Sequence, residues 1–145
     1  ENIMVDTRAR IKLLDFGVAT KGQYDTIGDP GFVRGSPSYM SPEQIMGTRL
    51  DRRSDLYSVG VMFYELLRGK LPFDAKEPHV VLFSHVRERP ADLPYGIPIQ
   101  VRLIVNKLLE KSPLDRYETA EQVIVDIDKA LEEIGEEWFA LNDDF

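Results

Sequence analysis

The sequence contains no cysteine and no long apolar run, and both absences narrow the class of protein. Without cysteine there are no disulfides and no thiolate zinc sites, which fits a reducing compartment. The longest apolar stretch, residues 59–64, stops at Glu65, well short of the roughly 18 residues of a membrane span. A signal-peptide pattern and a starting Met are also missing, so we expect the chain to begin within a longer protein. We predict a cytoplasmic segment without membrane contact, whose parent protein has room for an anchor elsewhere.

The second half of the chain has few basic residues for its acidic ones, half as many. Residues 1–73 carry 10 Lys and Arg against 9 Asp and Glu, whereas residues 74–145 carry 8 against 16, and the net charge is −7. This acidity argues against nucleic acid as a partner. A solvated acidic helix face explains it most simply. The length of 145 residues and the 43% apolar content suit one globular domain with a modest core.

The N-terminal region has two short strand-like runs, residues 2–6 and 11–15, joined by a connection that is short enough for a hairpin. An antiparallel pair brings Asn2 close to Asp15, thirteen positions later. An amide oxygen beside a carboxylate suits Mg²⁺, with phosphate oxygens and water as the other ligands. On these two residues alone, a surface Asn near a turn Asp is the simpler explanation.

Asp15-Phe16-Gly17 ends the second run and opens a polar loop over residues 18–40. A strand fixes the acid, the aromatic packs behind it, and the glycine lets the backbone turn away, which suits a site for a hard cation. Loops of this length in compact domains are usually functional or disordered. The loop hydroxyls are candidates for phosphorylation, although most loop hydroxyls are merely solvated.

Helix signals fill the rest of the chain. A capping box is formed by Ser41 and Gln44, with Pro42 in the first turn, and Gly47 ends this short helix. Glu43 could be explained by the helix dipole alone, which favours an acid in the first turn. Residues 52–55 lead into a helix over 56–68 that is apolar nearly all round, which predicts a central position. Three further amphipathic helices are expected at residues 78–86, 99–110 and 120–134, with a Pro-rich linker at 89–98 and a capping box at Thr119.

In this order and spacing, the features resemble the C-terminal lobe of a eukaryotic-type serine/threonine protein kinase, and the motif sequences are most similar to those of the bacterial members. Glu1-Asn2 resembles the end of the catalytic loop, Asp15-Phe16-Gly17 the metal-binding motif, and Ser41-Pro42-Glu43 the Ala-Pro-Glu motif. Residues 35–40 resemble the loop that receives the residue after the phosphoacceptor. The resemblance implies an α+β, mainly α fold: a small β hairpin, an activation segment, and a helical bundle around a central buried helix. Residues 1–134 would form this part of the lobe, and residues 135–145 an acidic tail with Trp138 and Phe139.

The resemblance also implies roles in catalysis. Asn2 and Asp15 would hold Mg²⁺ on ATP, because phosphoryl transfer depends mainly on positioning and electrostatics. Phe16 would pack inward and set the state of the loop, and Gly17 would complete the ATP-binding motif. Ser36 would assist by ordering the catalytic loop near the acceptor. The implied partners are ATP and a protein substrate.

Three further residues have structural roles by the same resemblance. Glu43 would form a buried ion pair with Arg116, and Asp55 would be the buried helix acid that holds the catalytic-loop backbone. Phe32 stands where many relatives carry a phosphorylated Thr, so we expect any activating phosphate at another hydroxyl, with Thr26 and Ser36 as the alternatives. The possible phosphosites are Thr20, Thr26 and Ser36.

Several parts of a complete kinase do not occur in the sequence. The glycine-rich loop, the ATP-pairing lysine with its glutamate, and the His-Arg-Asp residues are missing, so the segment alone would be inactive and the catalytic base is expected upstream of Glu1. The alternative is a pseudokinase or a fragment that serves as a protein-binding scaffold. The helix that normally packs on the central one is missing too. Apolar surface of Val59, Met62 and Phe63 should therefore be exposed, unless another chain or copy covers it.

Overall fold

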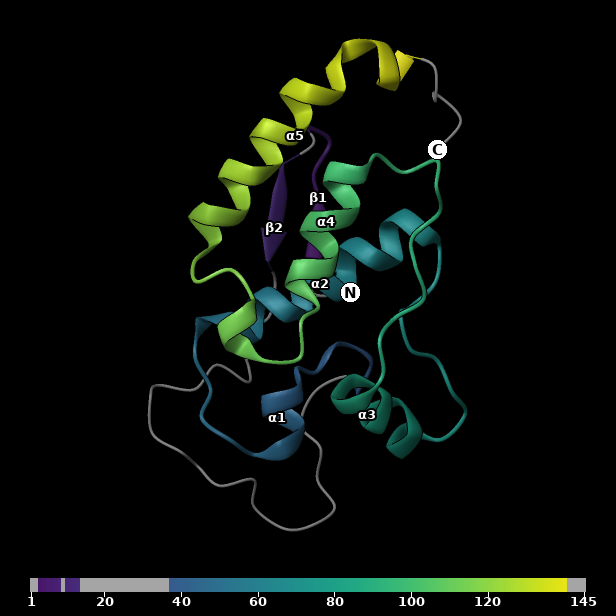
Figure 1. The fold of residues 1–145 in the computed structure, drawn as a ribbon, viewed down its shortest axis with the longest axis vertical. Helices are drawn as coiled ribbons and strands as arrows, with labels where there is room; N and C mark the ends of the chain where they lie inside the picture. The colour runs from purple at the N-terminus through teal and green to yellow at the C-terminus, as the bar shows by residue number, and fades with distance from the viewer. Residues whose placement is uncertain (1–2, 9, 14–36, 141–145) are drawn as a thin grey trace. The chain divides into compact units, whose positions relative to one another are not determined.

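The computed structural model of the chain describes residues 3–8, 10–13 and 37–140 (Figure 1). The chain divides into two compact units, Glu1–Gly35 and Ser36–Phe145. The described part of the first unit is a two-stranded hairpin, and the described part of the second is helical. This composition confirms the expected α+β, mainly α class.

The hairpin consists of β1 (Ile3–Val5) and β2 (Ile11–Leu13), which pair antiparallel with Ile3 opposite Leu13. Asp6 organises the turn, because its carboxylate accepts hydrogen bonds from the backbone N–H groups of Arg8 at 2.8 Å and of Arg10 at 3.0 Å. These bonds, that to Arg10 foremost, hold the pKa of Asp6 below its ordinary value. The predicted hairpin is confirmed, with strands shorter than the apolar runs.

The second unit begins with η1 (Pro37–Tyr39) and α1 (Pro42–Met46). Ser41 caps α1: its hydroxyl accepts from Gln44 N, and the Gln44 side chain accepts from Ser41 N at 2.8 Å. Gly47 ends the helix with φ 63°, in the left-handed region where glycine is favoured. The sequence predicted both ends of α1 correctly, because each depends on side chains within one helical turn.

α2 (Arg52–Arg68) starts earlier than the expected residue 56. The carboxylate of Asp51 accepts from Arg53 N at 2.8 Å and caps the helix, so that the polar residues before Leu56 join its first turn. Gly69, at φ 74°, ends the helix as predicted. Leu56, Tyr57, Val61 and Tyr64 are buried along α2, which places the helix in both apolar clusters of the unit.

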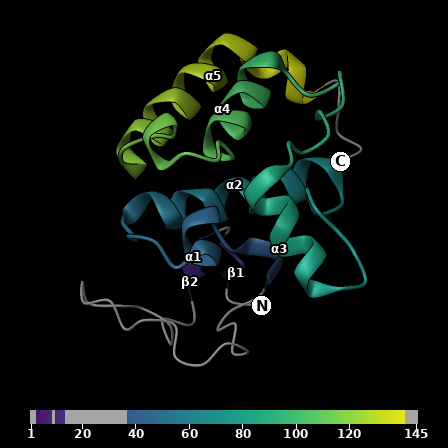
Figure 2. The same cartoon turned by 60° about the horizontal axis from the view of Figure 1, so that its bottom comes forward.

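The remaining helices are α3 (Pro78–Arg87), α4 (Ile99–Leu108) and α5 (Ala120–Ala140), with the short η2 (Pro113–Asp115) between the last two. α4 packs against both α2 and α5 (Figures 1 and 2). Gly60 permits the close approach of α2 to α4, since a Cβ at this position would lie 2.7 Å from Leu108 Cβ. The two clusters share this interface: Leu108 belongs to one and Leu109 to the other.

α5 extends beyond the predicted end at residue 134. Gly135 interrupts the helix with φ 69° and ψ 165°, and helical structure continues to Ala140. The proposed tail, residues 135–145, therefore begins at a break in the helix. The side chains of Trp138 and Phe139 lie outside the described part. At the other end, Thr119 Oγ1 accepts from Gln122 N at 3.4 Å, but the Gln122 side chain bonds Glu118 N rather than Thr119 N.

The expected exposure of apolar surface on α2 is present. Val59, Met62 and Phe63 are half-buried, and Leu66 is 74% exposed. Among the described residues, no helix is both long and apolar enough to cross a membrane.

Candidate functional site

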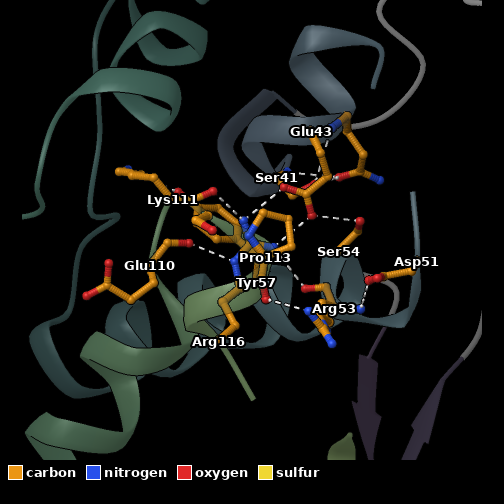
Figure 3. Close-up of polar contacts among 12 residues, drawn as sticks. Ser41, Glu43, Asp51, Arg53, Ser54, Tyr57, Glu110, Lys111, Pro113 and Arg116 are labelled. Atoms are coloured by element: carbon orange, nitrogen blue, oxygen red, sulfur yellow. Dashed lines mark hydrogen bonds and ion pairs between the residues drawn. The ribbon is translucent and has the colours of Figure 1, made fainter. Parts of the chain in front are cut away.

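The helical unit is linked by a buried ion pair between Glu43 and Arg116, residues 73 positions apart (Figure 3). Arg116 Nη1 lies 2.7 Å from Glu43 Oε1 and Nη2 lies 2.8 Å from Oε2, which is a bidentate arrangement. The Arg116 side chain is 0% exposed and the Glu43 side chain is 3% exposed. Glu43 is thus more than a first-turn acid favoured by the helix dipole, since the structure brings it together with Arg116.

The remaining donors of Arg116 all find backbone acceptors. Nε donates to Glu110 O at 2.7 Å, Nη1 to Arg53 O at 3.0 Å, and Nη2 to Lys111 O at 3.0 Å. Because every N–H of the guanidinium has a partner, the pair meets the main condition for a tolerable buried charge. Arg116 therefore holds together α1, the first turn of α2 and the segment that follows α4.

Ser54 donates a further hydrogen bond to the carboxylate of Glu43. Its buried hydroxyl donates to Glu43 Oε1 at 2.7 Å from the first turn of α2 (Figure 3). Burial raises the pKa of Glu43, but the hydrogen bonds from Arg116 and Ser54 outweigh this effect and leave the pKa below its ordinary value. Glu43 is therefore ionised at neutral pH.

Tyr57, His85 and Lys111 extend the cluster toward α3. The guanidinium of Arg116 lies 4.7 Å from the centre of the Tyr57 ring, and the Tyr57 hydroxyl lies 2.9 Å from His85 Nδ1. Lys111 Nζ donates to His85 O at 2.7 Å, at the C-terminal end of α3. We call Glu43, Ser54, Tyr57, His85, Lys111 and Arg116 the Arg116 cluster.

The pKa values of His85 and Lys111 are both lowered. Burial foremost, and then the charge of Lys111, lowers the pKa of the fully buried His85 to about 4, so the imidazole is neutral. Burial foremost, and then the charge of Arg116, lowers the pKa of Lys111 to about 8. Within the described residues, His85 Nε2 has no hydrogen-bond partner. Protonation of His85 would place a further positive charge in a region that already contains two.

The sequence assigned no role to His85 or Ser54. A signal for His85 did exist, because Val81, Ser84 and His85 have the spacing of one helix face and all three are buried. For Ser54 and Lys111 the sequence contains no such signal, since their partners come from distant segments.

Asp55 lies in the first turn of α2. Its side chain is exposed, and within the described part of the chain it accepts no hydrogen bond. The resemblance gives this acid the catalytic-loop backbone as its partner, and that backbone is not among the described residues. The expected role of Asp55 therefore stays a prediction.

The proposed ATP and metal residues lie outside the described part of the chain. These are Asn2, Asp15, Phe16 and Gly17, and the same holds for Thr20, Thr26 and Ser36. Among the described residues, no group of three or more His, Asp or Glu side chains is placed to hold a metal ion. The structure does describe the hairpin between Asn2 and Asp15, in which Ile3, the residue after Asn2, pairs with Leu13.

Comparison with known proteins decides the family. Residues 1–126 match the family model described as "Protein kinase domain". The chain belongs to the protein kinase family. The resemblance inferred from the sequence is therefore confirmed, and protein kinases generally use ATP and Mg²⁺.

Three curated proteins that this kinase segment is similar to are bacterial. It is 38% identical over 132 residues to a probable serine/threonine-protein kinase of Clostridium perfringens, covering 89% of this chain and 19% of that protein. It is 36% identical to the serine/threonine-protein kinase PrkC of Bacillus subtilis, covering 99% of this chain and 23% of that one. With PknB of Mycobacterium leprae it shares 37% identity, over 87% of this chain and 21% of the relative. The segment thus spans about a fifth of the length of these proteins.

Proposed function

We propose that the protein containing this segment transfers the γ-phosphoryl group of ATP to serine or threonine hydroxyls of proteins. The segment contributes the second part of the kinase domain: one side of the metal site, the turn that receives the substrate, and the Arg116 cluster, which holds α1 directly after this turn. The catalytic base and the ATP-pairing lysine would come from residues that precede Glu1. The segment alone is therefore expected to be inactive.

The observation that carries the proposal is the register of the hairpin. Ile3 is opposite Leu13, so the chain enters β1 and leaves β2 at the same end of the hairpin. Asn2 directly precedes this end, and Asp15 follows it by two residues. An amide and a carboxylate form a donor set that suits Mg²⁺, which prefers oxygen ligands and retains several waters. When bound, Mg²⁺ would neutralise charge on the ATP phosphates, and Asn2 and Asp15 would orient it.

The experiment uses the full-length protein with Mg-ATP. We expect autophosphorylation in the wild type and a loss of at least about a hundredfold in Asp15→Ala, because electrostatic stabilisation of the transferring group is a dominant effect. Asp128→Ala, which removes an exposed carboxylate from α5, is the matched control and should retain wild-type incorporation. Equal incorporation in the wild type and Asp15→Ala would refute the proposal.

A binding measurement separates metal binding from the chemical step. Mg-ATP should raise the melting temperature of the wild type and of Asp128→Ala, since a ligand that binds only the folded state stabilises it. The shift should be reduced in Asp15→Ala. An unchanged shift together with lost activity would mean that Asp15 has a role other than Mg-ATP binding.

The second candidate function is a scaffold, and the exposed apolar surface of α2 favours it. Leu66 is 74% exposed beside the half-buried Met62 and Phe63, and a patch of this kind often marks an interaction site. A pseudokinase would bind partners, or a second copy, through this surface without phosphoryl transfer. Absence of autophosphorylation in the wild type, together with self-association that Leu66→Lys abolishes, would favour this function over the first.

A further inference from the structure

Tyr39, the last residue of η1, is attached to α2 at two points. Its phenol donates a hydrogen bond to Glu65 Oε2, and its carbonyl oxygen accepts one from Ser58 Oγ at 2.8 Å. Ser58 and Glu65 are seven residues apart, which is two helical turns, so they lie on the same face of α2. One residue is thus anchored to one helix face by its side chain and its backbone.

The hydroxyl of Ser58 favours η1 over its own helix. Serine within a helix commonly bonds the carbonyl four residues earlier. Here the distance from Ser58 Oγ to Ser54 O is 3.5 Å, against 2.8 Å to Tyr39 O. Ser84 on α3 shows the ordinary case, since its hydroxyl bonds Val80 O at 3.0 Å within the same helix.

η1 also packs against α3, but among the described residues the hydrogen bonds that join it to α2 are those of Tyr39. None of the η1 residues is buried, although the Tyr39 ring packs partly against the cluster formed by Tyr57, Val61 and Tyr64. Ring packing holds a side chain but leaves the backbone of a short turn free to shift. The bond from Ser58 is therefore the contact that orients the Tyr39 peptide group relative to α2.

We propose that Ser58 is a positioning residue for the protein substrate, because it holds the turn at residues 37–40 in the orientation that receives the residue after the phosphoacceptor. This inference rests on the proposed kinase function. It assigns to Ser58 an effect on the peptide substrate and not on ATP, since among the described residues its hydroxyl donates hydrogen bonds only to Tyr39 O and to Ser54 O of its own helix.

The test compares three variants of the full-length protein. Ser58→Ala removes the bond, Ser58→Thr keeps a hydroxyl, and Ser84→Ala removes a buried hydroxyl that bonds only within its own helix. The substrate is a synthetic peptide copied from an autophosphorylation site mapped in the wild type by mass spectrometry. Loss of one hydrogen bond corresponds to about a fivefold change in an equilibrium constant. We therefore expect Ser58→Ala to raise the peptide KM about fivefold with an unchanged KM for ATP, Ser58→Thr to restore most of it, and Ser84→Ala to behave as the wild type.

Hydrogen–deuterium exchange gives a second readout that does not depend on activity. Ser58→Ala should increase exchange in residues 37–41 and not in α3, whereas Ser84→Ala should leave residues 37–41 unchanged. Unchanged exchange in Ser58→Ala overturns the proposed attachment. Faster exchange with an unchanged peptide KM in an active enzyme overturns the substrate role alone. An inactive wild type refutes the kinase function and, with it, the substrate role, even if the exchange result shows that the attachment exists.

Discussion

The Arg116 cluster makes a quantitative prediction about Arg116→Met. This change retains an apolar stem but removes the guanidinium, so the Glu43 carboxylate, whose side chain is 3% exposed, is left with Ser54 as its remaining side-chain donor. Three backbone carbonyls, those of Arg53, Glu110 and Lys111, lose a donor at the same time. Breaking a buried pair by removing one partner costs about 3–5 kcal/mol. Since domains are stable by only about 5–15 kcal/mol, this loss is a large fraction of the total.

The assay is urea unfolding of the kinase domain that contains this chain, followed by far-UV circular dichroism. We expect the free energy of unfolding to fall by about 3–5 kcal/mol in Arg116→Met. Arg52→Ala is the matched control, because it breaks the ion pair with Glu118 at 2.8 Å, in which the side chains are 61% and 56% exposed. Exposed pairs contribute about 1 kcal/mol or less.

A double-mutant cycle separates the pair from the other contacts of Arg116. In Glu43→Met combined with Arg116→Met, no unpaired buried charge remains, so the double variant should lose at least about 2 kcal/mol less than the sum of the two single variants. The reasoning is refuted if Arg116→Met loses no more stability than Arg52→Ala, or if the two single losses add without coupling.

Two further predictions concern the core. The pKa of His85 is lowered from 6.5 to about 4, so between these pH values the unfolded chain binds a proton that the folded chain does not. The free energy of unfolding should therefore fall by about 2–3 kcal/mol as the pH decreases from 6.5 to 4. His85→Gln should flatten this pH dependence, whereas His79→Gln, at an exposed position, should not. Gly60→Ala should destabilise the domain by about 1–3 kcal/mol despite the better helix propensity of alanine, because its Cβ would clash with Leu108; in Gly96→Ala, where no atom lies within 4 Å, urea unfolding should be close to wild type.

Helix ends were predictable where the chemistry is local. Ser41, Gln44 and Gly47 fixed α1 because a capping box and a left-handed glycine act within a single turn. The predicted start of α2 at residue 56 was wrong, because the prediction followed the apolar pattern, which begins at Leu56. The helix begins in the polar residues before it, where Asp51 caps the first turn and Arg52 bonds the carbonyl and carboxylate of Glu118.

The site was only partly predictable for the opposite reason. Glu43 and Arg116 could be paired through the family resemblance, but no local pattern joins residues 73 positions apart. Ser54 and Lys111 were missed because their partners are supplied by tertiary structure. The role expected for Asp55 stays a prediction, because the backbone that it would hold is not among the described residues.

The way α1 and η1 are attached explains why the site depends on polar contacts. α1 has five residues, of which only Pro42 and Glu43 are buried, and η1 has no buried residue. Isolated helices of this length are unstable in water, and so little apolar burial cannot fix their orientation. Hydrogen bonds and ion pairs are directional, so the bonds from Arg116 and Ser54 to Glu43 and from Ser58 to Tyr39 determine how these turns face α2. A buried ion pair contributes little net stability compared with apolar residues of the same volume, so we infer that its main effect here is to select one arrangement of α1. Arg116 and the polar residues of α2 thus orient the turns that follow the loop, while the apolar residues of α2 stabilise the helical unit.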